Sequence, residues 1–150
     1  MNVKIKLLHP SARVPEYKTE GAAAADVCAA IDSPITIEPG EFALVPTGFA
    51  IDAEGSESAD FAVLLFARSG LASKHGIALA NGVGVIDPDY RGEVKVALTN
   101  LSREPYTITP GERIAQMMIT PILRANFEVA DELSSTERGD GGFGHTGKNT

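Results

Sequence analysis

The sequence predicts an all-β domain, a jelly-roll-like sandwich or distorted barrel of many short strands with one short helix. Short apolar segments rich in Val, Ile, Thr and Phe recur along the 150 residues, and these residue types favour strands. Fifteen glycines and nine prolines separate the segments at the close spacing typical of turns between short strands. We expect one domain over residues 1–130 and a flexible, glycine-rich segment over residues 131–150, where the composition becomes polar.

The first expected strand is MNVKIKLLHP, where Val3, Ile5 and Leu7 alternate with period two until Pro10. This alternation indicates a strand and not a signal peptide. Four further stretches continue the strand pattern: PITIEPGEFALVPTGFAI, DFAVLLF, GVGVIDPDYRGEVKVAL and EPYTITPGERIAQMMITPI. Residues 36–45 weakly resemble residues 107–116, and the recurrence of Pro-Gly turns in β proteins explains this similarity most simply.

Residues 69–76, SGLASKHG, form the one segment with a helical pattern. We expect Ser69 to cap its start and Gly76 to end it. Arg68 and Ser69 follow the apolar segment FAVLLFA, so backbone N–H groups, a hydroxyl and a guanidinium meet at one place. Such a meeting point suits an anion, although an ordinary N-cap beside a surface arginine is the simpler local interpretation.

The composition limits the possible partners and the compartment. The net charge of −7 argues against a general nucleic-acid binder but leaves a small phosphorylated ligand open, because a few arginines can outweigh it locally. The single cysteine, Cys28, excludes an internal disulfide and suits a reducing compartment, so we expect a cytoplasmic protein. No apolar run approaches the roughly 20 residues of a membrane span, so we expect no membrane partner.

The stretch NGVGVIDPDYRGEV places Asp87 and Asp89 on either side of Pro88, in a turn between two apolar strands. An EF-hand is excluded because its bidentate glutamate would fall on Leu98. A carboxylate held beside a strand can act as a general base, and the alternative is a hairpin turn with solvated acids.

The stretch GERIAQMMI places Arg113 and Gln116 within an apolar strand. Polar groups in such a strand need hydrogen-bonding partners. Gln116 therefore either faces a ligand or is an amide satisfied by the backbone.

The last thirteen residues, RGDGGFGHTGKNT, contain G-x-G-x-x-G and also a P-loop pattern in which Asn149 replaces the expected Ser or Thr. Both motifs need a helix directly after the glycines, and the sequence leaves no room for one. We set both motifs aside. Taken alone, the composition most simply indicates a disordered glycine-rich tail. The alternative is a mobile segment that closes over a base and its phosphates, which Phe143 suits with Arg138 and Lys148 on either side.

Five segments, taken in this order, resemble the motifs of the trimeric dUTP diphosphatases (dUTPases): AAAADV, ARSGLA, NGVGVIDPDYRGEV, GERIAQMMI and RGDGGFGHTG. The resemblance implies a jelly-roll-like subunit and a homotrimer whose active sites lie between subunits, with the tail of one closing over a site made by others. It also implies Mg²⁺-assisted hydrolysis of dUTP to dUMP and pyrophosphate, which keeps uracil out of DNA and supplies dUMP for thymidylate synthesis.

The resemblance further implies a role for each matched residue. Asp87 would orient and deprotonate the attacking water, and Asp26 would position the Mg²⁺–triphosphate complex through the metal's water shell. The hairpin from Asn81 would read uracil, Tyr90 would pack beneath the sugar, and Phe143 would stack on the base. The implied substrate-binding residues are Arg68, Ser69, Gly70, Asn81, Gly84, Val85, Ile86, Tyr90, Gln116, Arg138, Phe143, Gly144 and His145.

Four positions depart from the usual family motifs, and they concern the fine geometry of the metal and phosphate contacts. They are Ala24, Ala25, Ala67 and His145.

Two other functions are disfavoured. A dCTP deaminase would carry a catalytic glutamate about ten residues after Asp87, where this chain has Ala97. A catalytically inactive relative that binds nucleotides is disfavoured because both Asp26 and Asp87 are present, and a turnover assay distinguishes it.

Overall fold

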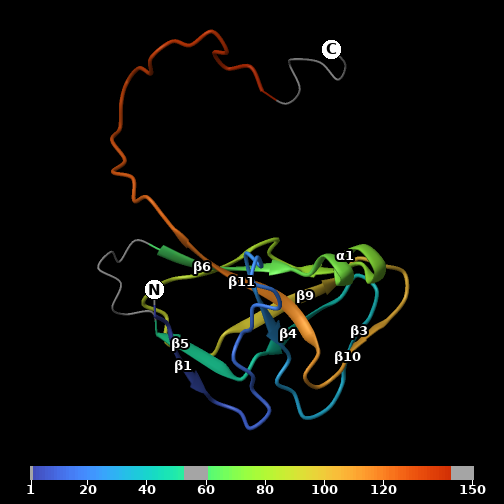
Figure 1. Ribbon diagram of the computed structural model, residues 1–150. Coiled ribbons are helices and arrows are strands. Elements are labelled where there is room, and N and C mark those ends of the chain that lie inside the picture. Colours follow the sequence, from blue (N-terminus) through green and yellow to red (C-terminus); the bar gives the residue numbers. More distant parts are fainter. Residues whose placement is uncertain (1, 53–60, 143–150) are drawn as a thin grey trace.

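The computed structural model describes residues 2–52 and 61–142, which form eleven strands and one helix (Figure 1). The predicted all-β fold with one short helix is confirmed. In chain order the elements are β1 (Lys4–Leu7), β2 (Ala25–Cys28), β3 (Ile35–Ile37), β4 (Phe42–Pro46), β5 (Phe49–Asp52), β6 (Phe61–Ala67), α1 (Ser69–His75), β7 (Ile77–Leu79), β8 (Gly84–Ile86), β9 (Lys95–Asn100), β10 (Tyr106–Ile108) and β11 (Arg113–Pro121).

The strands form four antiparallel sheets, with orders β1-β5, β10-β3, β2-β11-β6-β8 and β4-β9-β7. Alternation along each strand directs one side chain in two into a single shared core. On β9, for example, Val96 and Leu98 are buried whereas Lys95 is exposed. The four-stranded sheet matters most for function, because it brings together four of the five motif segments.

The helix α1 lies where the sequence predicts it, and Gly76 ends it in the left-handed conformation with φ 66°. The expected cap at Ser69 is wrong. Arg68 occupies the N-cap position, with extended backbone, and makes no side-chain capping hydrogen bond. The reason is that β6 continues through Ala67, so the chain first turns into helical geometry at Ser69.

The two similar segments found in the sequence pair with each other. Strands β3 and β10 are antiparallel neighbours, with Thr36 opposite Thr107 and their hydroxyl oxygens 2.9 Å apart. Each segment then turns at a left-handed glycine, Gly40 with φ 80° and Gly111 with φ 76°. Both turns thus require the same Pro-Gly chemistry, which accounts for the similarity.

The chain leaves the body after β11. Residues 122–142 contain no helix or strand, and this arm, orange to red in Figure 1, extends away from the sheets. Its apolar side chains Leu123, Phe127, Val129 and Leu133 are almost fully exposed. The strands therefore end at Pro121, and the domain boundary at residue 130 stays a prediction. Over the described residues, no helix is long and apolar enough to cross a membrane.

Candidate active site

A charged cluster, here named the Asp26 cluster, comprises Asp26, Arg68, Arg113 and Gln116. Strand pairing creates it, because Gln116 on β11 lies opposite Asp26 on β2 and opposite Phe66 on β6. Arg68 comes two residues after Phe66, just past the end of β6. Three segments that are far apart in the sequence therefore meet at one end of the sheet.

The Asp26 carboxylate is the centre of this cluster. It is 6% exposed, and its Oδ2 accepts a hydrogen bond from Arg113 Nη1 at 2.7 Å. Its Oδ1 accepts from Arg68 Nε at 3.3 Å and from Gln116 Nε2 at 3.4 Å. Arg68 also donates from Nη1 to the Arg113 carbonyl oxygen at 3.1 Å, which ties the two arginines together.

The electrostatics of the cluster favour anions. Burial alone would raise the pKa of Asp26, but the hydrogen bond from Arg113 and the charges of Arg68 and Arg113 lower it below 3.8. Asp26 is therefore ionised at neutral pH, and two guanidinium groups face one carboxylate. The Arg68 and Arg113 side chains keep 24% and 45% of their surface exposed, so they can still contact a ligand.

Because Arg113 lies within an apolar strand, the sequence predicts that its side chain has a hydrogen-bonding partner. That partner is the Asp26 carboxylate. The amide of Gln116 donates to the same carboxylate, and this side-chain contact decides against the purely backbone-satisfied alternative. The resemblance assigned a role to Gln116 but none to Arg113. The signal was present in the sequence as a cation inside an apolar strand.

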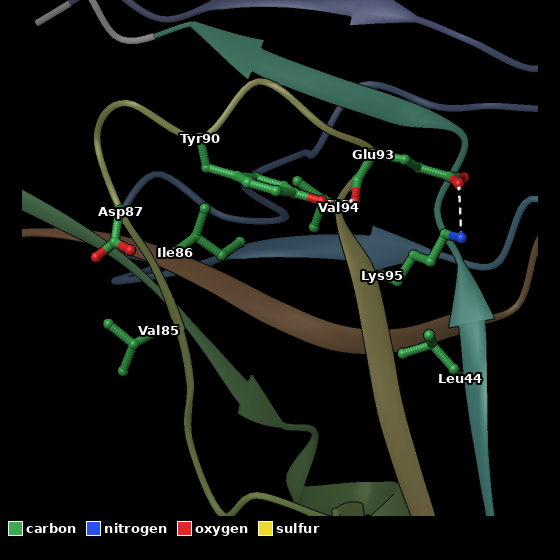
Figure 2. Close-up of a pocket in the computed structure, with 8 residues that line it drawn as sticks. All are labelled: Leu44, Val85, Ile86, Asp87, Tyr90, Glu93, Val94 and Lys95. Carbon is green, nitrogen blue, oxygen red and sulfur yellow. Dashed lines mark hydrogen bonds and ion pairs between the residues drawn. The ribbon is translucent and has the colours of Figure 1, made fainter.

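A second site is a pocket of about 330 Å³ next to β8 (Figure 2). Its lining contains three of the predicted hairpin and sugar residues together with Asp87. The lining residues are Leu44, Val85, Ile86, Asp87, Tyr90, Glu93, Val94 and Lys95. The sequence motifs imply no site role for Leu44, Glu93, Val94 or Lys95.

The hairpin over residues 81–86 turns tightly and packs closely on β6. Gly82 adopts φ 73°, and the Val83 N–H donates to the Asn81 carbonyl oxygen at 2.8 Å. At Gly84 a Cβ atom would lie 3.0 Å from the Leu65 Cβ, so glycine permits the close approach of β8 to β6. The Val85 side chain is 64% exposed on this hairpin, at the lining of the pocket.

Asp87 follows β8 on a turn that other side chains hold in place. The Tyr90 N–H donates to the Asp87 carbonyl oxygen at 3.1 Å. Arg91 donates from Nη1 to the Pro88 carbonyl oxygen at 2.7 Å and forms an ion pair with Asp52 at 3.2 Å. The Asp87 carboxylate thus lies on a braced loop and lines the pocket, whereas Asp89 does not line it.

The two sites lie at opposite ends of β6. Ile86, next to Asp87, pairs with Val63 near the start of β6, whereas Arg68 follows its end. Five residues of strand at about 3.3 Å each separate Val63 from Arg68 by roughly 16 Å. The Arg68 side chain moreover reaches Asp26 on β2, which lies on the other side of β6 from β8.

Among the described residues, the predicted Arg138 is brought to neither site. Arg138 lies on the arm, where its Nε donates to the Gly141 carbonyl oxygen at 2.9 Å. Phe143, Gly144 and His145 lie outside the described residues. Ser69 and Gly70, by contrast, lie next to the Asp26 cluster, because they begin α1 directly after Arg68, where the first backbone N–H groups of a helix have no intrahelical acceptor.

Comparisons with known proteins show which family the chain resembles. A model of the dUTPase family matches residues 11–147. The chain is 48% identical over 150 residues to the deoxyuridine 5'-triphosphate nucleotidohydrolase of Desulfitobacterium hafniense, covering 97% of each chain. It is 52% identical over 134 residues to the protein of that name from Desulfotalea psychrophila, covering 89% of this chain and 87% of the relative.

A solved structure of similar shape is the Staphylococcus bacteriophage 80alpha dUTPase with dUpNHpp. It matches with a TM-score of 0.85 and 29% sequence identity, over 98% of this chain and 99% of that one. The family match covers most of the chain, and the described β sheets reproduce the fold of these relatives. The chain belongs to the dUTPase family.

Proposed function

We propose that the protein hydrolyses dUTP to dUMP and pyrophosphate by attack of water at the α-phosphorus. The observation that carries this proposal is the pocket beside β8, which the Asp87 carboxylate and the Tyr90 ring line together with Val85 and Ile86 (Figure 2). The named relatives support the choice of dUTP. The single Cys28 suits a reducing compartment, and we propose the cytoplasm, where dUMP would serve thymidylate synthesis.

The hairpin over residues 81–86 suits the recognition of a base by its edge. Within residues 2–52 and 61–142, β8 is an edge strand that pairs with β6, so backbone N–H and C=O groups of its other edge could bind a ligand. Uracil presents two carbonyl oxygens and one N–H between them, which such a backbone can match. A base bound edge-on against this backbone would have no space for a 5-methyl group, which distinguishes thymine from uracil.

Asp87 is suited to act as the general base. Its carboxylate would accept a proton from a water molecule, which then attacks the α-phosphorus. The new P–O bond forms as the bond from the α-phosphorus to the α,β-bridging oxygen breaks, and pyrophosphate leaves with the electron pair. The loop that Arg91 braces against Pro88 and Asp52 would keep the carboxylate aligned with the water.

The Asp26 cluster suits the phosphate chain and a metal ion carried by it. Both carboxylate oxygens of Asp26 already accept hydrogen bonds, so direct ligation would displace an arginine. The described residues contain no group of three or more carboxylate, histidine or cysteine side chains that would hold a metal by itself. Mg²⁺ commonly retains waters and binds substrate phosphates, so these residues fit an outer-sphere contact through water.

When bound, Mg²⁺ would neutralise negative charge on the triphosphate. The chain itself would contribute Arg68, Gln116 and the N–H groups at the start of α1, which would bind phosphate oxygens. Arg138 on the arm would reach the terminal phosphate when the arm closes over the site.

We propose a homotrimer in which each active site is shared. The Asp87 pocket and the Asp26 cluster of one chain lie too far apart to contact the same α-phosphate. A second copy would therefore supply the Asp26 cluster, and the arm would come from another copy. The exposed apolar side chains Leu123, Phe127 and Val129 support this assembly, because an isolated arm leaves them in water.

The proposal is tested by product analysis with purified protein, Mg²⁺, and dUTP or each standard deoxynucleoside triphosphate in separate reactions. We expect dUMP and pyrophosphate from dUTP alone. In ¹⁸O-labelled water the label should appear in dUMP, because the attack is at the α-phosphorus. Formation of dUDP and orthophosphate, or deamination of dCTP, would contradict the proposal.

A further inference from the structure

We propose that Gly92 and the main chain of Glu93 are positioning residues that hold the Tyr90 ring in place before a nucleotide binds. Through that ring they set the preference for deoxyribose over ribose. The inference rests on the proposed function in one respect, the placement of the sugar on Tyr90. The position of the ring itself follows from contacts among described residues.

The first contact is steric. A Cβ atom added to Gly92 would lie 2.6 Å from Tyr90 Cζ and 3.0 Å from Cε2, and closer still to the hydroxyl oxygen. Real Cβ atoms do not approach other heavy atoms to less than 3.0 Å. Gly92 does not adopt the left-handed conformation. A side chain at position 92 would therefore displace the Tyr90 ring, because the ring lies directly on the Gly92 backbone.

The second contact orients the ring. The Tyr90 hydroxyl donates to the Glu93 carbonyl oxygen at 3.1 Å, so the side chain bends back along its own loop. Figure 2 shows the ring lying along the loop toward Glu93 and Val94. The residue as a whole remains 46% exposed, so the ring still presents surface to the pocket.

The acceptor of that hydrogen bond is itself anchored to the body. The Glu93 carboxylate accepts from the Gly48 N–H at 2.9 Å and lies 3.6 Å from Lys95 Nζ. The next residue, Val94, is buried, donates its N–H to Phe49 and accepts from the Thr47 hydroxyl at 2.6 Å. The loop segment over residues 92–93 beneath Tyr90 is therefore anchored to the body, through the Glu93 carboxylate on Gly48 and through the buried Val94 that follows it.

This anchoring has a chemical consequence for the sugar. A ring that lies on Gly92 with its hydroxyl bound to Glu93 resists the movement that would make room for an extra 2′-hydroxyl. The 2′-hydroxyl of a ribonucleotide would then clash with the ring, and this clash weakens the binding of the ribonucleotide. An alanine at position 92 would push the Tyr90 ring away from the backbone of Gly92 and Glu93. The sugar would then no longer pack against a ring in a fixed position.

The Gly92→Ala variant tests the inference through the ratio of kcat/KM for dUTP to kcat/KM for UTP. We expect this ratio to fall about tenfold or more, the usual worth of one poorly fitted group in a pocket. The KM for dUTP should rise while kcat changes little, because Arg91 braces the Asp87 loop separately. Gly21→Ala is the matched control, since a Cβ there meets nothing within 4 Å and the ratio should stay unchanged.

A double-mutant cycle shows whether Gly92 acts through Tyr90. In a Tyr90→Ala background, Gly92→Ala should cause no further change in the ratio. An unchanged ratio in Gly92→Ala, or an equal further fall in the Tyr90→Ala background, would overturn the inference.

The wild-type protein without nucleotide gives a readout independent of catalysis and of any folding defect in the variants. We expect nuclear Overhauser contacts between the Tyr90 ring protons and the Gly92 α-protons. The ring signals are assigned by their loss in Tyr90→Phe. Absence of these contacts would refute the fixed ring even if dUTP is hydrolysed. If the contacts are present but the protein does not hydrolyse dUTP, the proposed function is refuted. The inference that Gly92 and Glu93 hold the Tyr90 ring would then still stand.

Discussion

Replacing Asp26 with asparagine tests the electrostatics of the Asp26 cluster. The variant keeps the shape of the side chain but loses its charge. An NH₂ group, which is a hydrogen-bond donor, replaces one carboxylate oxygen and faces the guanidinium donors. Hydrogen bonds to charged groups contribute about 1.5–3 kcal/mol each, and exposure of the arginine reduces this. Because Arg113 is 45% exposed and Arg68 24% exposed, we expect a total loss of about 2 kcal/mol. In a chain of this size that loss lowers Tm by about 4–8 °C.

The pH dependence of this loss has a definite sign. The folded-state pKa of Asp26 lies below the ordinary 3.8, so its contribution to stability is present above that pH. The contribution should disappear as the pH falls through the lowered pKa, where wild type and variant converge. Urea unfolding of both proteins measures the difference in their free energies of unfolding at each pH. The two proteins are compared at equal concentration, because assembly contributes to stability. Equal stability at neutral pH, or a difference that persists in strong acid, would refute this reasoning.

Two further predictions concern the core and the arm. Burial and the hydrogen bond to Glu112 at 2.5 Å raise the pKa of Tyr106 to about 12, so stability should fall as the pH rises between about 10 and 12. Tyr106→Phe should remove the last phenolate step from an ultraviolet titration, and an unchanged titration would contradict this assignment. Cutting the chain after residue 137 should leave Tm unchanged, since β11 ends at Pro121, but should abolish most turnover with Arg138 and Phe143 removed. Full activity of the shortened protein would show that the arm is dispensable.

The local features of the fold could be predicted from the sequence because they depend on local chemistry. The strand-forming segments, the Pro-Gly turns and the end of α1 at Gly76 all follow from residues close in the chain. The cap at Ser69 could not be placed to one residue, because the extent of β6 decides which residue first turns helical. The pairing of β3 with β10 required contacts across about seventy residues, which periodicity does not encode.

The candidate site shows the same division. Arg113 could be recognised as a cation that needs a partner, but its partner Asp26 lies 87 residues away, and only the order of β2, β11 and β6 brings them together. Likewise the sequence shows Gly92 only as a turn glycine, because the direction of the Tyr90 ring depends on the anchoring of Glu93. The resemblance supplied the roles of Asp26 and Asp87. The structure adds that one chain holds them at opposite ends of β6.

The separation of these two sites is tested most directly by mixing two inactive proteins. Asp87→Asn lacks the base, Arg68→Ala lacks a phosphate ligand, and each alone should have lost on the order of 10²-fold or more of its turnover. After equal amounts are dissociated and reassembled together, each shared site draws the two residues from different copies. About one quarter of the sites then regain both native residues, so about one quarter of wild-type activity should return. If a single chain supplied both residues to each site, no activity would return, and the shared-site account would be wrong.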